Sequence, residues 1–171
     1  MNIFYLHEDA TAIPSVMYDK HVVKMILETA QLLCTAHQTY AEQLGYDNSY
    51  IPYKKAYYNH PSAVWARENS ANYNWLYLHF LALCDEYTTR YGKVHASYTK
   101  CAEVLYDAPV GIPQSDTMSK MPQCMPDEFK ADCSIQAYRN YYLGGKTHIA
   151  KKDEKIITEL FRCPMWEIIS T

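Results

Sequence analysis

The chain has 171 residues, of which 49% are apolar and 20% charged, and its formal net charge is −3. These proportions are typical of a folded domain and exclude an intrinsically disordered chain. The negative charge excludes a protein that coats DNA through an overall positive field, but it leaves room for a local basic patch. We therefore predict a single domain over residues 1–171 that is large enough to bury its own core.

Signals for export, membrane insertion and metal binding are missing from the sequence. The opening residues, MNIFYLHEDATAIP, have no basic segment followed by an apolar one, as a signal peptide would. No apolar run reaches the ~18 residues that a membrane span needs. No two cysteines have the CxxC spacing of zinc ribbons. We expect a cytoplasmic protein with reduced thiols that uses no membrane, metal or cofactor.

Helical periodicity dominates the first half of the chain. Apolar residues at i, i+3, i+4 spacing predict a long helix over residues 16–44, ended by Gly45. A second long helix is predicted over residues 60–91, with Pro61 in its first turn and Gly92 after its end. The apolar stripe expected to face the core from the first helix comprises Val23, Ile26, Leu27, Ala30, Leu33, Cys34 and His37.

Shorter helices are predicted over residues 97–105, 133–143 and 153–161, the second of them ended by Gly144 and Gly145. The proline-rich residues 107–128 predict an ordered loop. No alternating strand pattern interrupts these elements. The expected fold is all-α, a compact single-domain helical fold framed by two long helices.

One group of candidate catalytic residues lies near the start of the first predicted helix. His21 and Glu28 are seven residues apart, about two helical turns, so they share a face with Lys24. A carboxylate, an imidazole and amines on one surface can supply acid/base or nucleophilic chemistry. The candidates are therefore Asp19, Lys20, His21, Lys24 and Glu28. The alternative is an ordinary solvated helix face.

A second group, Asn59, His60, Arg67 and Asn74, is a candidate for substrate binding. The last three are spaced by sevens and would line up along the second helix. The planar guanidinium of Arg67 suits a phosphate. The alternative is that Asn59 or His60 caps the helix and Arg67 lies on the surface. A further stripe of mixed charge, from Glu68 to Arg90, predicts a salt-bridged surface face.

A third group is formed by Tyr138, Arg139, Tyr141, Tyr142 and Lys146. Cations interleaved with aromatic residues are typical of nucleic-acid contacts, in which bases stack on Tyr and cations reach phosphates. The alternative is a helix whose tyrosines belong to the core.

The first and third groups together resemble the phage-type pyrimidine-dimer DNA glycosylases with abasic-site lyase activity. That family has an Asp-x-His motif near its N-terminus and a catalytic Glu seven residues after the His. Asp19, His21 and Glu28 match this motif. The family also has a Tyr-Lys-Tyr-Tyr-Gly-Lys type segment that contacts DNA, which residues 138–146 match after a small insertion.

The resemblance implies a DNA substrate and an amine that attacks C1′ of a deoxyribose to form an imine. Glu28 would serve as acid/base and would stabilise the oxocarbenium-like transition state. The amine would be the α-amine of Met1 or Asn2, with Lys20 or Lys24 as alternatives. His21, His60 and Arg67 would hold phosphates or the flipped base.

The sequence departs from the family pattern at three points. Arginines flank the catalytic Glu in the family, whereas Leu27 and Gln31 stand there in this chain. The family exposes its nucleophile by removing Met before a small residue, whereas the second residue of this chain is Asn2. Family members are also basic.

These departures keep alternative functions open. The chain also resembles a group of phage and bacterial proteins of undetermined function through the segments DKHVVKMILETAQ, NHPSAVWAR, EYTTRYGKVH and AYRNYY. One alternative is a phage enzyme that modifies a thymine-type base in DNA. The other is a module without catalysis that binds a nucleotide or a host protein.

Overall fold

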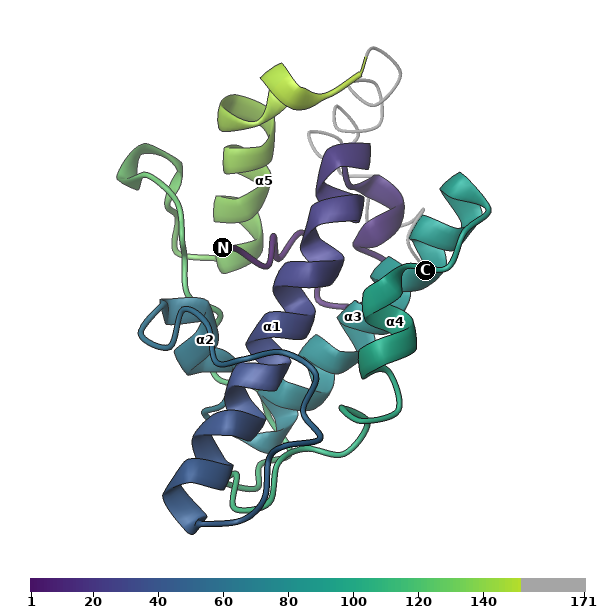
Figure 1. Cartoon of the computed structure of the whole chain (residues 1–171). Helices are drawn as coiled ribbons and strands as arrows, with labels where there is room; N and C mark the ends of the chain where they lie inside the picture. The colour runs from purple at the N-terminus through teal and green to yellow at the C-terminus, as the bar shows by residue number, and fades with distance from the viewer. Residues whose placement is uncertain (152–171) are drawn as a thin grey trace.

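A computed structural model describes residues 1–151, and these form helices joined by loops, with no β-strand among them. The longest helices, α1 and α3, pack against each other (Figure 1). This arrangement confirms the predicted all-α fold framed by two long helices. None of the described helices combines the length and the apolarity needed to cross a bilayer. The α-helices are α1 (Asp19–Leu44), α2 (Pro61–Ala66), α3 (Ser70–Tyr91), α4 (Ala96–Cys101) and α5 (Ser134–Gly145), and the 3-10 helices are η1 (Pro14–Val16), η2 (Asp127–Phe129) and η3 (Thr147–Ile149).

Helix α1 begins three residues later than predicted and ends where predicted. The short helix η1 precedes it, and the extended backbone of Met17 separates the two. At the other end Gly45 adopts the left-handed conformation, φ +73°, that stops a helix. Most of the predicted core stripe is buried, but Val23 and Leu27 are each 40% exposed.

The buried face of α1 differs from the predicted one, because it includes Val22 and Met25 in place of Val23 and Leu27. Its physical cause is the N-terminal segment, whose Phe4 ring stacks on His21 with 4.3 Å between ring centroids. A helix covered from two sides buries more than one stripe, which periodicity alone does not reveal.

The predicted second long helix is two helices, so that prediction is wrong over residues 67–69. Asn69 has an extended backbone, φ −157° and ψ 168°, and its side chain accepts a hydrogen bond from the Asn72 N–H. It therefore caps a new helix. The backbone N–H of Ser70 donates to Pro113 O at 2.9 Å, which fixes the break. His60, Arg67 and Asn74 therefore do not line up along one helix.

The middle of the stripe that was predicted to be a salt-bridged surface face belongs to the core. Asn72, Trp75 and His79 are buried, and Trp75 stacks on His79. Only the end of the stripe behaves as predicted, where Arg90 Nε lies 2.6 Å from Glu86 Oε1.

Helix α5 includes Gly144 and Gly145, which were predicted to end it. The Phe129 ring lies 2.5 Å from the place where a Cβ on Gly144 would stand. These glycines therefore permit a close approach of the preceding segment rather than a stop. The predicted helix over 153–161 and Cys163 lie outside the described residues. The predicted burial of Cys34 and Cys84 is confirmed.

The N-terminal segment is part of the core. Ile3, Leu6 and Ile13 are completely buried. Phe4, with φ +57°, turns the chain where it passes α1. This path brings the first residue of the chain beside the first half of α1 (Figure 1), which positions the site described next.

Candidate active site

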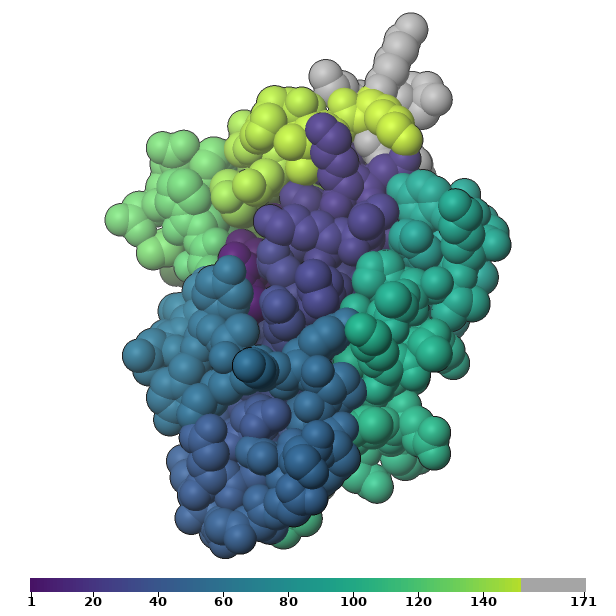
Figure 2. Space-filling view, in the orientation of Figure 1, coloured from purple at the N-terminus to yellow at the C-terminus, as the bar shows by residue number. Residues whose placement is uncertain are grey.

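A small polar cavity of about 200 Å³ lies where the N-terminus meets α1 and the end of α5. Figure 2 shows the N-terminal residues reaching the surface between α1 and α5 on this face of the molecule. We call this cavity the Glu28 cavity. Its lining comes from four segments: Met1, Asn2 and Phe4; His21, Lys24, Met25 and Glu28; Cys124; and Tyr141 and Lys146.

The Glu28 carboxylate is the centre of the cavity's charged contacts, and its side chain is only 13% exposed. Its Oε2 lies 3.8 Å from the α-amino nitrogen of Met1 and accepts a hydrogen bond from the Asn2 backbone N–H at 3.3 Å. Its Oε1 lies 3.2 Å from Lys24 Nζ. A nearly buried carboxylate therefore faces two amines.

The Asn2 side chain locks the N-terminus in place. Its Oδ1 accepts hydrogen bonds from the backbone N–H groups of Ile3 and Phe4, at 2.8 and 3.3 Å. Its Nδ2 donates to the carbonyl of Cys124 at 2.8 Å. Sequence reasoning treated Asn2 only as a possible source of the amine. The contact with Cys124 joins positions 122 residues apart and leaves no signal in a local pattern.

His21 lies in the wall of the cavity in a neutral state. Burial lowers its pKa to about 3, and the charges of Lys146 and Lys24 add to the effect. Its Nδ1 lies 2.6 Å from the Tyr142 hydroxyl, whose oxygen also accepts from the Tyr18 backbone N–H at 3.2 Å. Donation from Tyr142 to Nδ1 leaves the ring proton on Nε2.

His60 does not line the Glu28 cavity, but it interacts electrostatically with two of its charged groups. Its Nδ1 accepts a hydrogen bond from the Ser62 N–H at 3.1 Å, so it caps α2, the alternative considered from sequence. Its pKa is lowered by burial and by the α-amine of Met1, and Glu28 opposes this shift. The His60 side chain therefore interacts electrostatically with the Met1 α-amine and with Glu28.

Asp19 and Lys20, two candidate catalytic residues, lie outside the Glu28 cavity. Asp19 Oδ1 is 2.9 Å from Arg90 Nη1, and its other oxygen is paired with Lys151. The hydrogen bond with Lys151, assisted by Arg90, lowers the pKa of Asp19. Asp19 thus ties α1 to α3, and Lys20 is exposed.

The break between α2 and α3 separates Asn74 from the other members of the second group of candidates. Arg67 is held against the preceding loop, where its Nη1 donates to Tyr58 O at 2.8 Å. Asn59 and Asn74 are exposed, the latter on α3. Only His60 of this group is coupled to the charged groups of the cavity.

The aromatic segment of α5 divides between core and cavity. Tyr138 and Tyr142 are completely buried, so in this structure their rings cannot stack on a base, and that part of the prediction is wrong. Tyr138 donates to Pro122 O at 2.8 Å, and Tyr142 stacks on Tyr18. Burial raises the pKa of Tyr138 far above its usual value.

Two members of that segment do reach the cavity. Tyr141 lines it, and Lys146 Nζ lies 4.8 Å from the centroid of the Tyr141 ring. Arg139 contacts the N-terminal segment instead, because its Nε donates to Leu6 O at 2.9 Å.

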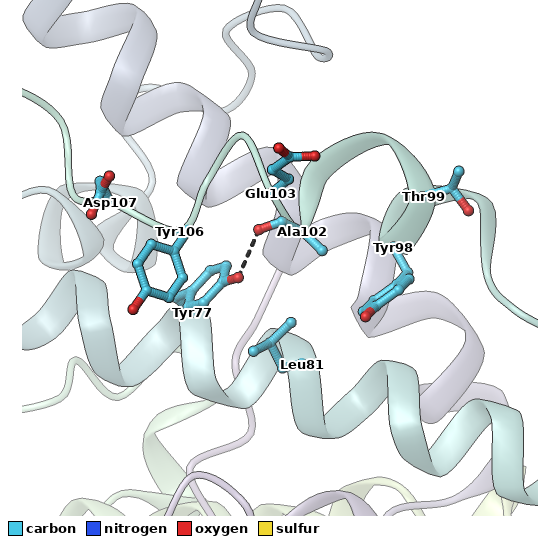
Figure 3. Close-up of a pocket in the computed structure, with 8 residues that line it drawn as sticks. All are labelled: Tyr77, Leu81, Tyr98, Thr99, Ala102, Glu103, Tyr106 and Asp107. Carbon is cyan, nitrogen blue, oxygen red and sulfur yellow. Dashed lines mark hydrogen bonds between the residues drawn. The ribbon is translucent and has the colours of Figure 1, made fainter.

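A larger cavity of about 660 Å³ lies between α3 and the segment that begins with α4 (Figure 3). Tyr77, Tyr98 and Tyr106 contribute to its wall, and the Tyr77 hydroxyl donates to Ala102 O at 2.6 Å. Glu103 and Asp107 also line it, whereas its described lining includes no Lys, Arg or His. Such a surface repels phosphates, so we place the functional site at the Glu28 cavity.

No group of three or more His, Cys, Asp or Glu side chains within residues 1–151 is arranged to hold a metal ion.

Comparison with known proteins identifies the family. A family model described as pyrimidine dimer DNA glycosylase matches residues 1–100, the part that carries Met1, His21, Glu28 and His60. No curated protein and no solved structure shows a significant match. Because the family model covers more than half of the 171 residues, the chain belongs to the pyrimidine dimer DNA glycosylase family.

Proposed function

We propose that the protein is a DNA glycosylase with abasic-site lyase activity, in which an N-terminal amine is the nucleophile and Glu28 the acid/base. The observation that carries this proposal is the 3.8 Å distance between the α-amine of Met1 and Glu28 Oε2 inside a polar cavity. A nucleophile within reach of a base is the arrangement that covalent catalysis requires.

The first step forms and breaks one bond at C1′. The α-ammonium gives up a proton, for which Glu28 is an adjacent acceptor. The amine lone pair then bonds to C1′ as the bond from C1′ to the pyrimidine nitrogen breaks, and the departing base takes the electron pair and a proton. The nearby carboxylate stabilises the positive charge that develops on the sugar.

The second step cleaves the strand. The second amine proton passes to O4′, which also takes the electron pair of the C1′–O4′ bond as that bond breaks. The nitrogen lone pair forms the C1′=N bond, and the resulting iminium ion acidifies the C2′ hydrogen. Removal of that hydrogen expels the 3′ phosphate oxygen by β-elimination. Glu28 faces the amine and is the general base we assign to this proton transfer.

Cations and neutral donors around the cavity suit the DNA backbone. Lys24 and Lys146 line it, and they provide positive charge that Leu27 and Gln31 do not. Neutral His21 can present Nε2–H, and we assign it, with His60, to the flipped nucleotide. Tyr138 and Tyr142 support the site from within the core.

The N-terminal amine that faces Glu28 can belong to either of two residues. If Met1 is retained, its α-amine is the nucleophile. If Met1 is removed, the nitrogen of Asn2, 3.3 Å from Glu28 Oε2, becomes the free amine. Lys24 Nζ, 3.2 Å from Glu28 Oε1, is the remaining candidate, whereas Lys20 does not line the cavity.

Borohydride trapping on a duplex with a single abasic site tests the proposal. We expect a covalent adduct that mass spectrometry places on the N-terminal peptide, with Met1 either present or removed. Glu28→Gln should reduce strand cleavage by roughly 10²–10⁴-fold while the circular dichroism spectrum stays unchanged. Lys24→Met is the matched control and should still form the adduct.

Other outcomes identify the alternatives. A modified thymine-type base without strand cleavage would indicate a base-modifying enzyme. Binding with no adduct and no altered base would indicate a module without catalysis. Either outcome contradicts the proposed glycosylase and lyase mechanism.

A further inference from the structure

The loop before α2 ends in a tight turn that holds Tyr57 in an unusual conformation. The backbone N–H of His60 donates to Tyr57 O at 2.8 Å, which closes a four-residue turn. Tyr57 has φ +52°, a left-handed value that is rare and strained for a bulky residue. Its side chain is nonetheless 61% exposed. The strain thus presents a large aromatic ring to solvent.

The next residue, Tyr58, is held in place by contacts with Arg67 and Lys55, and these contacts make the turn rigid. The Arg67 guanidinium carbon lies 4.1 Å from the centroid of the Tyr58 ring, and Nη1 of the same side chain donates to Tyr58 O. Lys55 Nζ lies 5.0 Å from that centroid. Within residues 1–151, by contrast, no hydrogen bond, ring contact or cation engages the Tyr57 side chain. Tyr57 is therefore an exposed aromatic ring beside a turn that Arg67 holds in place, whereas nearby Lys55 is paired with Glu42.

This turn is adjacent to the Glu28 cavity. The turn places the Cα atoms of Tyr57 and His60 within about 7 Å of each other. His60 Nδ1 accepts a hydrogen bond from the Ser62 N–H, and Ser62 Oγ lies 3.4 Å from Sγ of Cys124, which lines the cavity. In Figure 2 the loop before α2 and the N-terminal residues appear on the same face of the molecule. DNA that engages the cavity would therefore cover the face on which the turn lies.

We propose that Tyr57 is a base-stacking residue of the DNA-binding surface. Its ring packs against a base left unstacked beside the nucleotide that enters the Glu28 cavity, and Arg67 faces the neighbouring phosphate. An exposed ring on a rigid backbone loses little conformational freedom when it stacks. This assignment rests on the proposed function, because it requires damaged or abasic DNA at the cavity.

Fluorescence anisotropy with an abasic-site duplex, at several salt concentrations, measures the contribution of the ring. Tyr57→Ala should weaken binding by roughly five- to 150-fold, the range for one stacked base. The slope of affinity against salt should not change, because stacking neutralises no phosphate. Tyr57→Phe keeps the ring and should bind within about twofold of the unaltered protein.

Tyr50→Ala is the matched control, since Tyr50 is an exposed tyrosine of the same loop outside the turn. It should leave affinity unchanged. A 2-aminopurine placed next to the abasic site gives a second readout. Its fluorescence should rise on binding when it is unstacked from DNA and should be quenched by Tyr57, so Tyr57→Ala should show the larger rise.

The results separate this inference from the proposed function. If Tyr57→Ala and Tyr50→Ala bind alike while Glu28→Gln abolishes cleavage, the stacking role is wrong and the proposed function stands. If the unaltered protein neither binds nor cleaves abasic or dimer-containing DNA, the proposed function fails and the stacking role fails with it.

Discussion

The Tyr142 hydroxyl lies 2.6 Å from Nδ1 of His21, and this contact joins α5 to α1 across 121 positions of the chain. The same hydroxyl accepts a hydrogen bond from the Tyr18 backbone N–H. All three residues are buried. One hydroxyl group therefore fixes the orientation of a histidine in the wall of the Glu28 cavity.

Tyr142→Phe should destabilise the protein by about 1–3 kcal/mol, because it leaves a buried ring nitrogen and a buried N–H without this partner. Urea denaturation at pH 7 measures the change. Tyr106→Phe removes a hydroxyl from an exposed ring and should have no effect. Equal stability of the two variants would contradict the role assigned to the Tyr142 hydroxyl.

Asn2→Leu should slow imine formation more than it weakens DNA binding. The variant removes the three side-chain hydrogen bonds that hold the N-terminus, and a displacement of about 1 Å costs up to roughly 100-fold in rate. Asn2→Asp keeps the acceptor and should lose less. Single-turnover trapping and anisotropy separate the two effects. Unchanged trapping by Asn2→Leu would show that the anchor is not needed.

Asn69→Ala should cost about 1 kcal/mol of stability, because the side chain caps α3 by accepting the Asn72 N–H. Thermal denaturation followed by circular dichroism checks this. Asn74→Ala, at an exposed position inside the same helix, should be neutral or slightly stabilising, since Ala favours helix. Equal melting temperatures of the two alanine variants would contradict this prediction.

Lys24→Ala combined with Lys146→Ala should reduce the slope of log affinity against log salt by about 1.8 in duplex binding, if each lysine neutralises one phosphate. Both lysines line the Glu28 cavity. Lys93→Ala changes an exposed lysine that does not line it and should leave the slope unaltered. An unchanged slope for the double variant would place the DNA elsewhere.

Stability should fall as the pH drops below about 6.5, the ordinary pKa of histidine. Burial lowers the pKa of His21 to about 3 and those of His37 and His79 to about 4. Between these values the unfolded chain binds protons that the folded chain excludes, so unfolding is favoured. Each histidine contributes a slope of up to about 1.4 kcal/mol per pH unit, and the loss is complete below its folded pKa.

Urea denaturation between pH 7 and pH 4.5 measures that slope. His148→Gln replaces an exposed histidine and should leave the slope nearly unchanged. A flat stability profile across this interval would show that the three buried histidines are protonated in the folded protein.

Local sequence determined most of the helical framework. The end of α1 follows from Gly45, and the start of α2 follows from His60 and Pro61, because capping and helix-stop preferences act within a few residues. The same locality explains why His21 and Glu28 could be placed on one face from their spacing alone. The resemblance in residues 19–28 then pointed to the family that the comparison identified.

Only the tertiary structure decided which of the candidates lie together around the Glu28 cavity. The break at Asn69 depends on contacts with the segment near Pro113, and it separated Asn74 from His60 and Arg67. The burial of Tyr138 and Tyr142 follows from packing against Phe4 and Tyr18, and the N-terminal amine reaches Glu28 because Asn2 is anchored to Cys124. These contacts join residues far apart in the chain, and such contacts leave no trace in local periodicity, since they arise only when separate segments pack together.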